Sequence, residues 1–104
     1  MQDLSGFQRD LLYIIASLDR PHGLAIKREL ERYYGKRINE GRLYPNLDVL
    51  VDEGLVRKGQ KDRRTNYYEL TRTGVDDLMA RHTWEETKLE NITGYETASK
   101  AQSS

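Results

Sequence analysis

The chain has 104 residues, of which 37% are hydrophobic and 33% charged, and its formal net charge is zero. This length suits one domain with one modest core. Because the chain has no cysteine, disulfides, zinc-thiolate sites and thiol nucleophiles are excluded. No segment has the length and hydrophobicity of a signal peptide or a membrane span, so we expect a cytoplasmic protein with no membrane partner.

The zero net charge hides an uneven distribution of charge along the chain. Residues 1–26 carry a net charge of −1, residues 27–72 carry +4 and residues 73–104 carry −3. A basic segment between two acidic ends favours binding of a polyanion to the middle of the chain. We therefore expect the functional residues of a nucleic-acid binder between residues 27 and 72.

Three amphipathic helices are predicted in the first half of the chain. The first has Ser5 as its N-cap, and the second ends at Gly35. The third has Asn39 as its N-cap, and Pro45 in its early part requires a start near Gly41 or a kink. The apolar stripes are Phe7, Leu11, Ile14, Ile15 and Leu18 in the first helix, Ile26, Leu30, Tyr33 and Tyr34 in the second, and Leu43, Leu47, Leu50 and Val51 in the third.

The second half of the chain predicts a β-hairpin followed by a long helix. Two strand-like runs, residues 55–60 and 66–70, flank a polar and basic turn. Thr71 is placed to cap a helix over about residues 72–91, which would be about 30 Å long and longer than one small core requires. The last residues, 93–104, are small and polar, and we predict that they form a disordered tail.

The order of three helices and a basic-tipped hairpin is typical of a winged helix-turn-helix. We predict this mainly α fold, with its small β-hairpin, over residues 1–92. In such domains the third helix enters the major groove and the hairpin reaches the minor groove or the backbone. The residues expected to contact DNA from the third helix are Asn39, Arg42, Tyr44 and Asn46. Those expected to contact DNA from the wing and the backbone-facing loop are Lys36, Arg37, Lys61, Arg63, Arg64 and Thr65.

Each of these residues also has an ordinary structural interpretation. Arg42 and Asn46, which we place opposite the leucine stripe, could form a solvated helix surface, and Arg63 and Arg64 could be plain turn residues. Given the fold, we favour DNA contact for all of them. Tyr44 stays open between DNA contact and covering the core with its ring.

The predicted fourth helix favours a homodimer. Trp84 lies off the apolar stripe of this helix, so its ring is either exposed or buried by a second subunit. His82 has glutamates at helical spacing, but two histidines make a weak metal set, so we expect a buried or interface histidine, no metal and no cofactor. The predicted dimer contacts are Leu78, His82, Trp84 and Leu89. Tyr13 and Tyr33 are expected in the core.

Two classes of function follow, and catalysis is not one of them. The chain lacks a glycine-rich phosphate loop, a serine beside a histidine and convincing paired carboxylates, so we expect no enzyme and no catalytic residue. The first class is a sequence-specific regulator that binds duplex DNA at an inverted repeat. The alternative is a protein-interaction module on the same scaffold, without specific DNA binding. The sequence does not identify an effector ligand.

Two stretches of the chain resemble a known family. GRLYPNLDVLVDEGLV, from Gly41 to Val56, and DRRTNYYELTRTG, from Asp62 to Gly74, are similar to the PadR-like winged-helix transcription regulators, particularly their archaeal and haloarchaeal members. The likeness covers roughly residues 7–89. It implies promoter binding as a homodimer, usually as a repressor, with the C-terminal helix supplying much of the dimer contact. It also implies that the helix carrying Tyr44 is the recognition helix and that Arg63 lies on the wing.

Overall fold

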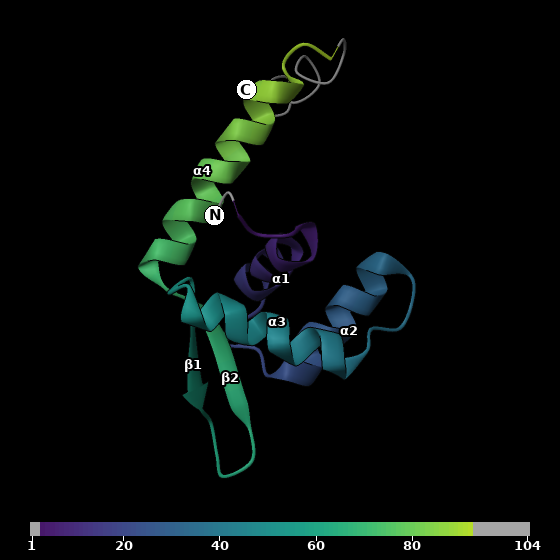
Figure 1. Cartoon of the computed structure of the whole chain (residues 1–104), viewed down its shortest axis with the longest axis vertical. Helices are drawn as coiled ribbons and strands as arrows, with labels where there is room; N and C mark the ends of the chain where they lie inside the picture. Colours follow the sequence, from purple (N-terminus) through teal and green to yellow (C-terminus); the bar gives the residue numbers. More distant parts are fainter. Residues whose placement is uncertain (1–2, 93–104) are drawn as a thin grey trace.

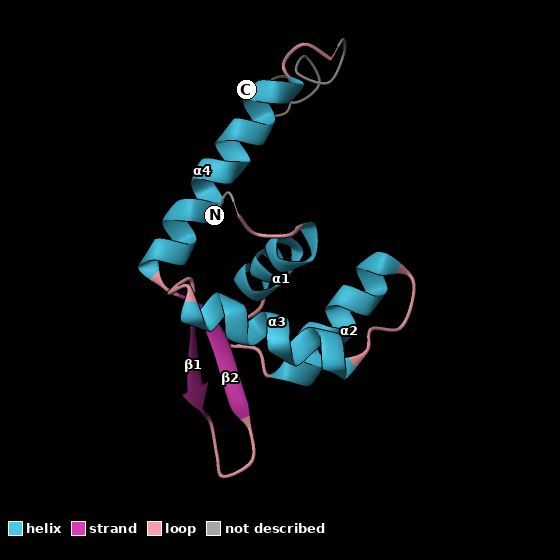
Figure 2. Ribbon diagram, viewed as in Figure 1, coloured by secondary structure: helices cyan, strands magenta, loops and turns pink. Residues whose placement is uncertain are grey.

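The computed structural model describes residues 3–92, and within this range it contains four helices and one β-hairpin. Their bounds are α1 (Gly6–Ser17), α2 (Gly23–Tyr34), α3 (Glu40–Asp52), β1 (Val56–Gln60), β2 (Asn66–Leu70) and α4 (Arg72–Leu89). Helices α1, α2 and α3 gather in one body, the hairpin extends from it in one direction, and α4 extends in the other (Figures 1 and 2). The predicted element order is confirmed, and the predicted tail, residues 93–104, lies outside the described residues.

The first helix begins and the second helix ends at the predicted residues. The Ser5 hydroxyl accepts a hydrogen bond from the Gln8 N–H (3.1 Å), and the Gln8 side chain accepts one from the Ser5 N–H (3.0 Å). This reciprocal pair is a capping box, which satisfies two amides that the helix itself cannot. Gly35 follows α2 with φ +71°, a left-handed conformation in which glycine is not penalised.

The third helix begins one residue earlier than predicted. The side-chain oxygen of Asn39 accepts a hydrogen bond from the Gly41 N–H (2.7 Å), which makes it the N-cap, as expected. Pro45 is therefore beyond the first turn and removes the donor that would bond the Gly41 carbonyl. Both residues are exposed, so water can take the place of the missing donor.

A third segment extends the hairpin beside β2. Strands β1 and β2 pair antiparallel, with Gly59 opposite Tyr67. On the other edge of β2, His22 forms a bridge with Tyr67, and the Tyr68 N–H donates to the Pro21 carbonyl (2.9 Å). The connection between α1 and α2 thus runs along the hairpin and joins it to the helical body.

One hydrophobic core holds the helices and the hairpin together. Its most deeply buried members come from α1, α2, α3 and the hairpin: Leu11, Leu12, Ile15, Ile26, Leu30, Leu43, Leu47, Leu50, Val56 and Tyr68. The three predicted leucines of α3 are completely buried, as their helical spacing indicated. Burial of this apolar set is the main favourable contribution to folding.

The prediction that Tyr13 and Tyr33 lie in the core is wrong. Tyr33 is 74% exposed and Tyr13 is 36% exposed. The core side of the last turn of α2 is occupied by the neighbouring Tyr34, whose hydroxyl donates to the Asp10 carboxylate (2.6 Å). Burial and this hydrogen bond raise the pKa of Tyr34 to about 12.

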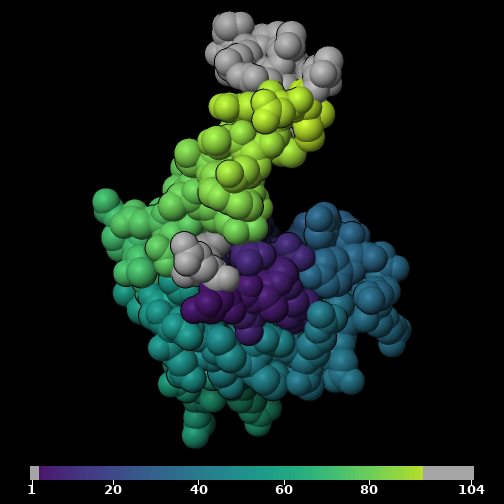
Figure 3. All heavy atoms as spheres, turned by 45° about the horizontal axis from the view of Figure 1, so that its top comes forward, coloured from purple at the N-terminus to yellow at the C-terminus, as the bar shows by residue number. Residues whose placement is uncertain are grey.

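Helix α4 starts on the core and then leaves it. Thr71 caps it by accepting a hydrogen bond from the Gly74 N–H (3.0 Å), as predicted, and Leu78 is buried at 6% exposure. Beyond this point the helix projects away from most of the body (Figure 3), although Tyr13 of α1 still contacts Glu85. The radius of gyration is accordingly 15.5 Å, against about 13 Å for a compact domain of this length. Among residues 3–92, no helix has both the length and the apolar character needed to cross a membrane.

Candidate nucleic-acid interface

Two predicted base-reading residues of α3 turn toward α1. The Arg42 guanidinium lies over the Phe7 ring, with its carbon 3.9 Å from the ring centroid. The Asn46 side-chain oxygen accepts a hydrogen bond from the Gln8 amide (2.8 Å), and its amide donates to the Arg42 carbonyl (2.7 Å). The prediction that these residues lie opposite the leucine stripe is wrong, because both flank it on the α1 side. Arg42 is nevertheless exposed, whereas Asn46 is half-buried.

The outward face of α3 carries residues that the sequence analysis did not select. Gly41 and Pro45 are exposed at its N-terminal half, and Asp48 and Asp52 are exposed further along. The two carboxylates would repel a polyanion, whereas the small residues and the helix N-terminus leave room for one. This face therefore favours a polyanion at the N-terminal half of α3, although the exposed Glu40 carboxylate lies in its first turn. The spacing of these residues, one helical turn apart, is visible in the sequence.

The remaining two predicted residues of α3 lie at this N-terminal half. Asn39 is exposed, although its side-chain oxygen already accepts the N-capping hydrogen bond from the Gly41 N–H. Tyr44 is half-buried and packs on the start of α2, where a Cβ added at Gly23 would come within 3 Å of its ring and hydroxyl. The structure thus favours the packing alternative for Tyr44, and Gly23 is the residue that makes space for it.

The turn of the hairpin presents cations on an ordered loop. Lys61, Arg63 and Arg64 are exposed. The Asp62 carboxylate accepts hydrogen bonds from the N–H groups of Arg64 and Thr65 (2.9 Å each), and the Lys61 N–H donates to the Thr65 carbonyl (2.8 Å). These bonds, chiefly the one from the Arg64 N–H, hold the pKa of Asp62 below its usual value. The loop shape therefore depends on a side-chain oxygen acceptor at its centre.

Unpaired cations gather at two places near α3. Several cations elsewhere pair with carboxylates, as in Arg32 with Glu29 (3.2 Å) and Arg72 with Asp76 (3.3 Å), although Arg28 and Arg42 are exposed and form no ion pair with the described residues. Within residues 3–92, the cations of the α2–α3 connection and the hairpin that form no ion pair are Lys36, Arg37, Lys58, Lys61, Arg63 and Arg64. The connection lies at the start of α3 and the hairpin beyond its end, so free cations bracket this helix (Figure 1). Such an arrangement suits a polyanion laid across α3.

A family model described as the transcriptional regulator PadR-like family matches residues 11–80, two thirds of the chain. This chain belongs to the PadR-like family of transcriptional regulators. The match spans α1 from Leu11, the helices α2 and α3, the hairpin and the first half of α4, so it covers every element of the candidate interface. The resemblance noted from the sequence is confirmed.

Solved structures support the same assignment. RosR of H. salinarum is 42% identical, over 98% of this chain and 90% of that one, with a TM-score of 0.85. A PadR-like regulator of Bacillus cereus is 23% identical, over 85% and 91% of the two chains, with a TM-score of 0.66. A mutant of E. coli MarR, complexed with operator DNA, is 22% identical, over 97% and 73%, with a TM-score of 0.70. The last two show the winged-helix fold alone. No match was found among curated proteins.

This PadR-like protein has a second notable surface, on the side of α4. Val75, Met79, Trp84 and Ile92 are between 42% and 59% exposed, whereas Leu78 is buried in the core of its own subunit. His82, expected to be buried or at an interface, has a 52% exposed side chain and lies 3.3 Å from the Glu86 carboxylate. Val75 and Met79 lie one turn apart on α4, Trp84 projects from another face of it, and Ile92 follows the helix. Exposed apolar side chains of this size are typical of an association surface.

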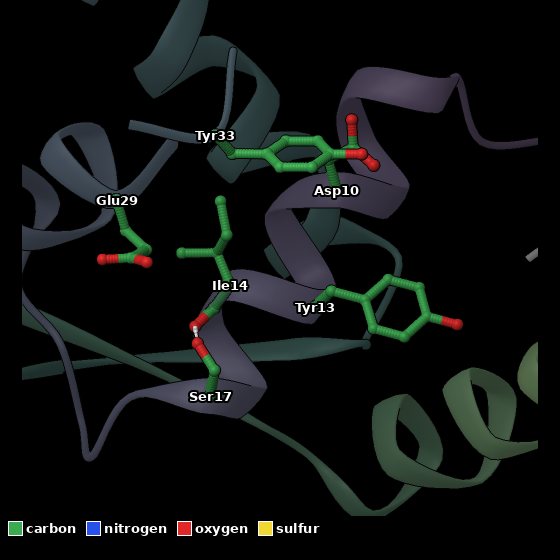
Figure 4. Close-up of a pocket in the computed structure, with 6 residues that line it drawn as sticks. All are labelled: Asp10, Tyr13, Ile14, Ser17, Glu29 and Tyr33. Carbon is green, nitrogen blue, oxygen red and sulfur yellow. Dashed lines mark hydrogen bonds between the residues drawn. The ribbon is translucent and has the colours of Figure 1, made fainter. Parts of the chain in front are cut away.

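A hollow of about 350 Å³ lies between α1 and α2. In Figure 4 the Tyr33 ring extends from α2 toward Asp10 on α1, and Tyr13 points toward α4. The Tyr13 hydroxyl donates to the Glu85 carboxylate (3.4 Å), and burial together with this carboxylate raises the pKa of Tyr13. Tyr13 thus links α1 to the outer half of α4 and also lines the hollow.

Proposed function

We propose that this DNA-binding transcriptional regulator acts as a homodimeric repressor at an inverted-repeat promoter site. Each subunit lays the N-terminal half of α3 in a major groove and its hairpin, the wing, along the neighbouring minor groove. The observation that carries the proposal is the pair of free cation groups that bracket α3. The protein acts by binding and not by catalysis, and its place of action is the cytoplasm, where it meets the promoter.

The wing and the α2–α3 connection supply most of the affinity. Arg63 and Arg64 enter the minor groove, whose negative potential favours arginine. Lys36, Arg37 and Lys61 contact phosphates, and Thr65 closes the turn that presents the arginines. Each phosphate neutralised releases a counterion, so binding must weaken steeply as salt is added.

The N-terminal half of α3 supplies the selectivity. Arg42 is exposed, and its long side chain can leave the Phe7 ring to bond a guanine edge with two donors. Asn39 lies at the start of α3, where it is close to the sugar-phosphate backbone of the bound DNA. Asn46 contributes to base reading only when it gives up its bond to Gln8, and Tyr44 fixes the angle of α3 against α2.

The homodimer forms through α4. Its exposed apolar side chains would be buried from water by a second copy of the chain, which presents the same surface about a two-fold axis. We place Met79, His82 and Leu89, which share one side of α4, and Trp84, which projects from the other side, in this contact, so the partner must cover more than one face of the helix. Leu78, the fourth predicted contact, supports the surface from within its own core. A two-fold dimer matches half-sites about one helical turn of DNA apart, which is about 34 Å.

The test is fluorescence anisotropy of the protein with its own upstream DNA and with a shuffled duplex, over a salt series. The double variant Arg63→Ala/Arg64→Ala should bind the upstream DNA at least tenfold more weakly, with a salt slope reduced by about two counterions. Arg72→Ala, an exposed arginine at the base of α4, is the matched control and should bind normally. Normal binding by the double variant would refute the wing assignment. Weak, salt-insensitive binding of wild type to both duplexes would favour the protein-interaction module.

The dimer has its own test in Trp84. Its side chain is about half exposed in the single subunit, so dimerisation can bury roughly 100 Å² of it, worth about 2.5 kcal/mol. Trp84→Ala should raise the dimer Kd by at least tenfold in sedimentation velocity, while Thr83→Ala, on the adjacent exposed position, should not. An unchanged Kd for the tryptophan variant would exclude α4 as the centre of the dimer.

A further inference from the structure

Arg20 lies outside the candidate interface, on the connection between α1 and α2, yet it contacts the wing closely. Its guanidinium lies over the Tyr67 ring (4.3 Å from carbon to centroid) and donates to the Tyr67 hydroxyl (2.7 Å). Its Nε is 3.6 Å from the Glu69 carboxylate. One side chain therefore makes three different contacts with β2.

These contacts continue across the hairpin to β1. The Tyr67 ring covers Gly59 so closely that a Cβ there would come within 2.4 Å of the ring. Glu69, in turn, forms a second ion pair with Arg57 of β1. Arg20, Tyr67 and Gly59 thus form a stack that spans the connection and both strands, on the face of the hairpin away from the core.

The backbone at Arg20 has an unusual conformation. Its φ is +47°, and among residues 3–92 it is the one non-glycine residue with positive φ. A turn alone would be better served by glycine, since other residues are penalised in this region. Pro21 follows Arg20. The Pro21 carbonyl accepts a hydrogen bond from the Tyr68 N–H, and His22 forms a bridge with Tyr67, so this connection is joined to β2. The conformation directs the arginine side chain onto the wing.

We propose that Arg20 is a positioning residue that sets the orientation of the wing relative to α3. The inference rests on the proposed function, because the wing must lie at a fixed angle for its arginines to enter a minor groove while α3 fills the major groove. In this proposal Arg20 acts through its contacts with Tyr67 and Glu69 and not through DNA. It raises affinity by keeping the wing ordered before DNA arrives.

The experiment compares Arg20→Ala and Arg20→Gly with Arg32→Ala, which removes an exposed arginine paired on α2 and away from the wing. Both Arg20 variants should bind the upstream DNA about fivefold more weakly, the effect of losing roughly one ordered contact. Tyr67→Phe keeps the ring and removes the hydroxyl. Its affinity for the upstream DNA should lie between those of the Arg20 variants and that of wild type. Wild-type binding by Arg20→Gly would overturn the proposal, because only the backbone conformation would then matter.

A double-mutant cycle separates positioning from direct DNA contact. When Arg63 and Arg64 are alanine, Arg20→Ala should have less than about a twofold further effect, because it acts through the wing. Independent, multiplying effects would mean that Arg20 contacts DNA, and would overturn the proposal.

A readout without DNA keeps this inference distinct from the proposed function. Trypsin should cleave after Arg63 and Arg64 about fivefold faster in Arg20→Ala than in wild type or Arg32→Ala, because the wing opens more often. Equal cleavage rates would overturn the positioning role. If the wild type lacks selective DNA binding but the cleavage rates differ, the proposed function fails while Arg20 still holds the wing.

Discussion

Replacing Gly74 with alanine should destabilise the protein, although alanine is the better helix former. Gly74 is the third residue of α4, and a Cβ there would lie 2.1 Å from the Leu55 carbonyl oxygen. This oxygen cannot move away cheaply, because it is a backbone atom that also accepts a hydrogen bond from the Thr71 N–H (3.0 Å). The start of α4 must therefore move off the hairpin by about 1 Å to restore a normal contact.

The opposing contributions give the size of the effect. Alanine gains at most about 1 kcal/mol from helix propensity. Overpacking against a rigid neighbour costs about 1–3 kcal/mol, and weakening the Thr71 hydrogen bond costs about 1 kcal/mol more. The net loss in free energy of unfolding is about 1–3 kcal/mol, which corresponds to a Tm lower by about 5–15 °C.

Thermal and urea unfolding followed by circular dichroism, at equal subunit concentration, measure this loss. Gly6→Ala is the matched control, because Gly6 is also at a helix start and a Cβ there meets nothing within 4 Å. It should leave the stability equal or raise it by up to about 1 kcal/mol. A Gly74→Ala variant as stable as wild type would mean that α4 does not press on the hairpin as described.

Two further predictions concern the wing and the half-buried hydroxyl of Tyr34. Asp62→Ala should weaken DNA binding even though it removes a negative charge, because the wing loses the acceptor for two N–H groups. Asp62→Asn keeps that acceptor and should bind at least as well as wild type; equal anisotropy curves for both variants would contradict this. The pKa of Tyr34 is raised in the fold to about 12 from an ordinary 10.0, so its contribution to stability is complete below pH 10 and is lost as pH rises toward 12. Tyr34→Phe should therefore lose less unfolding free energy over that pH range than wild type or the exposed control Tyr33→Phe, and an equal loss would refute the role of this hydroxyl.

The helix boundaries could be predicted from the sequence because their causes are local. Ser5, Asn39 and Thr71 each cap a helix with a hydrogen bond to an amide two or three residues away, and Gly35 ends one by its own conformation. Such contacts lie within a window that the sequence displays directly. The leucine stripe of α3 was equally visible from its spacing.

The orientation of the site could be predicted only in part. Arg42 and Asn46 were placed on the outer face, but their partners, Phe7 and Gln8, lie on another helix far away in the chain. Leu78 was assigned to a partner subunit, but the first half of α4 packs on its own core.

Arg20 gave no sequence signal, because its role depends on a left-handed backbone and on Tyr67, which is 47 residues away. Contacts of this kind follow from tertiary packing, which periodicity does not encode.

The Leu55 carbonyl has a mechanical consequence, because the base of the wing and the start of α4 meet there. The Thr71 hydroxyl adds a second link by donating to the Gly54 carbonyl (2.6 Å). We therefore expect a change in the tilt of α4 to rotate the wing about this junction. The five-residue strands are about 16 Å long, so a tilt of about 10° displaces the tip by roughly 3 Å. In a dimer, a change in the crossing angle of the two α4 helices would alter the distance between the two wings. It would therefore alter the spacing of the operator half-sites that the dimer can bind.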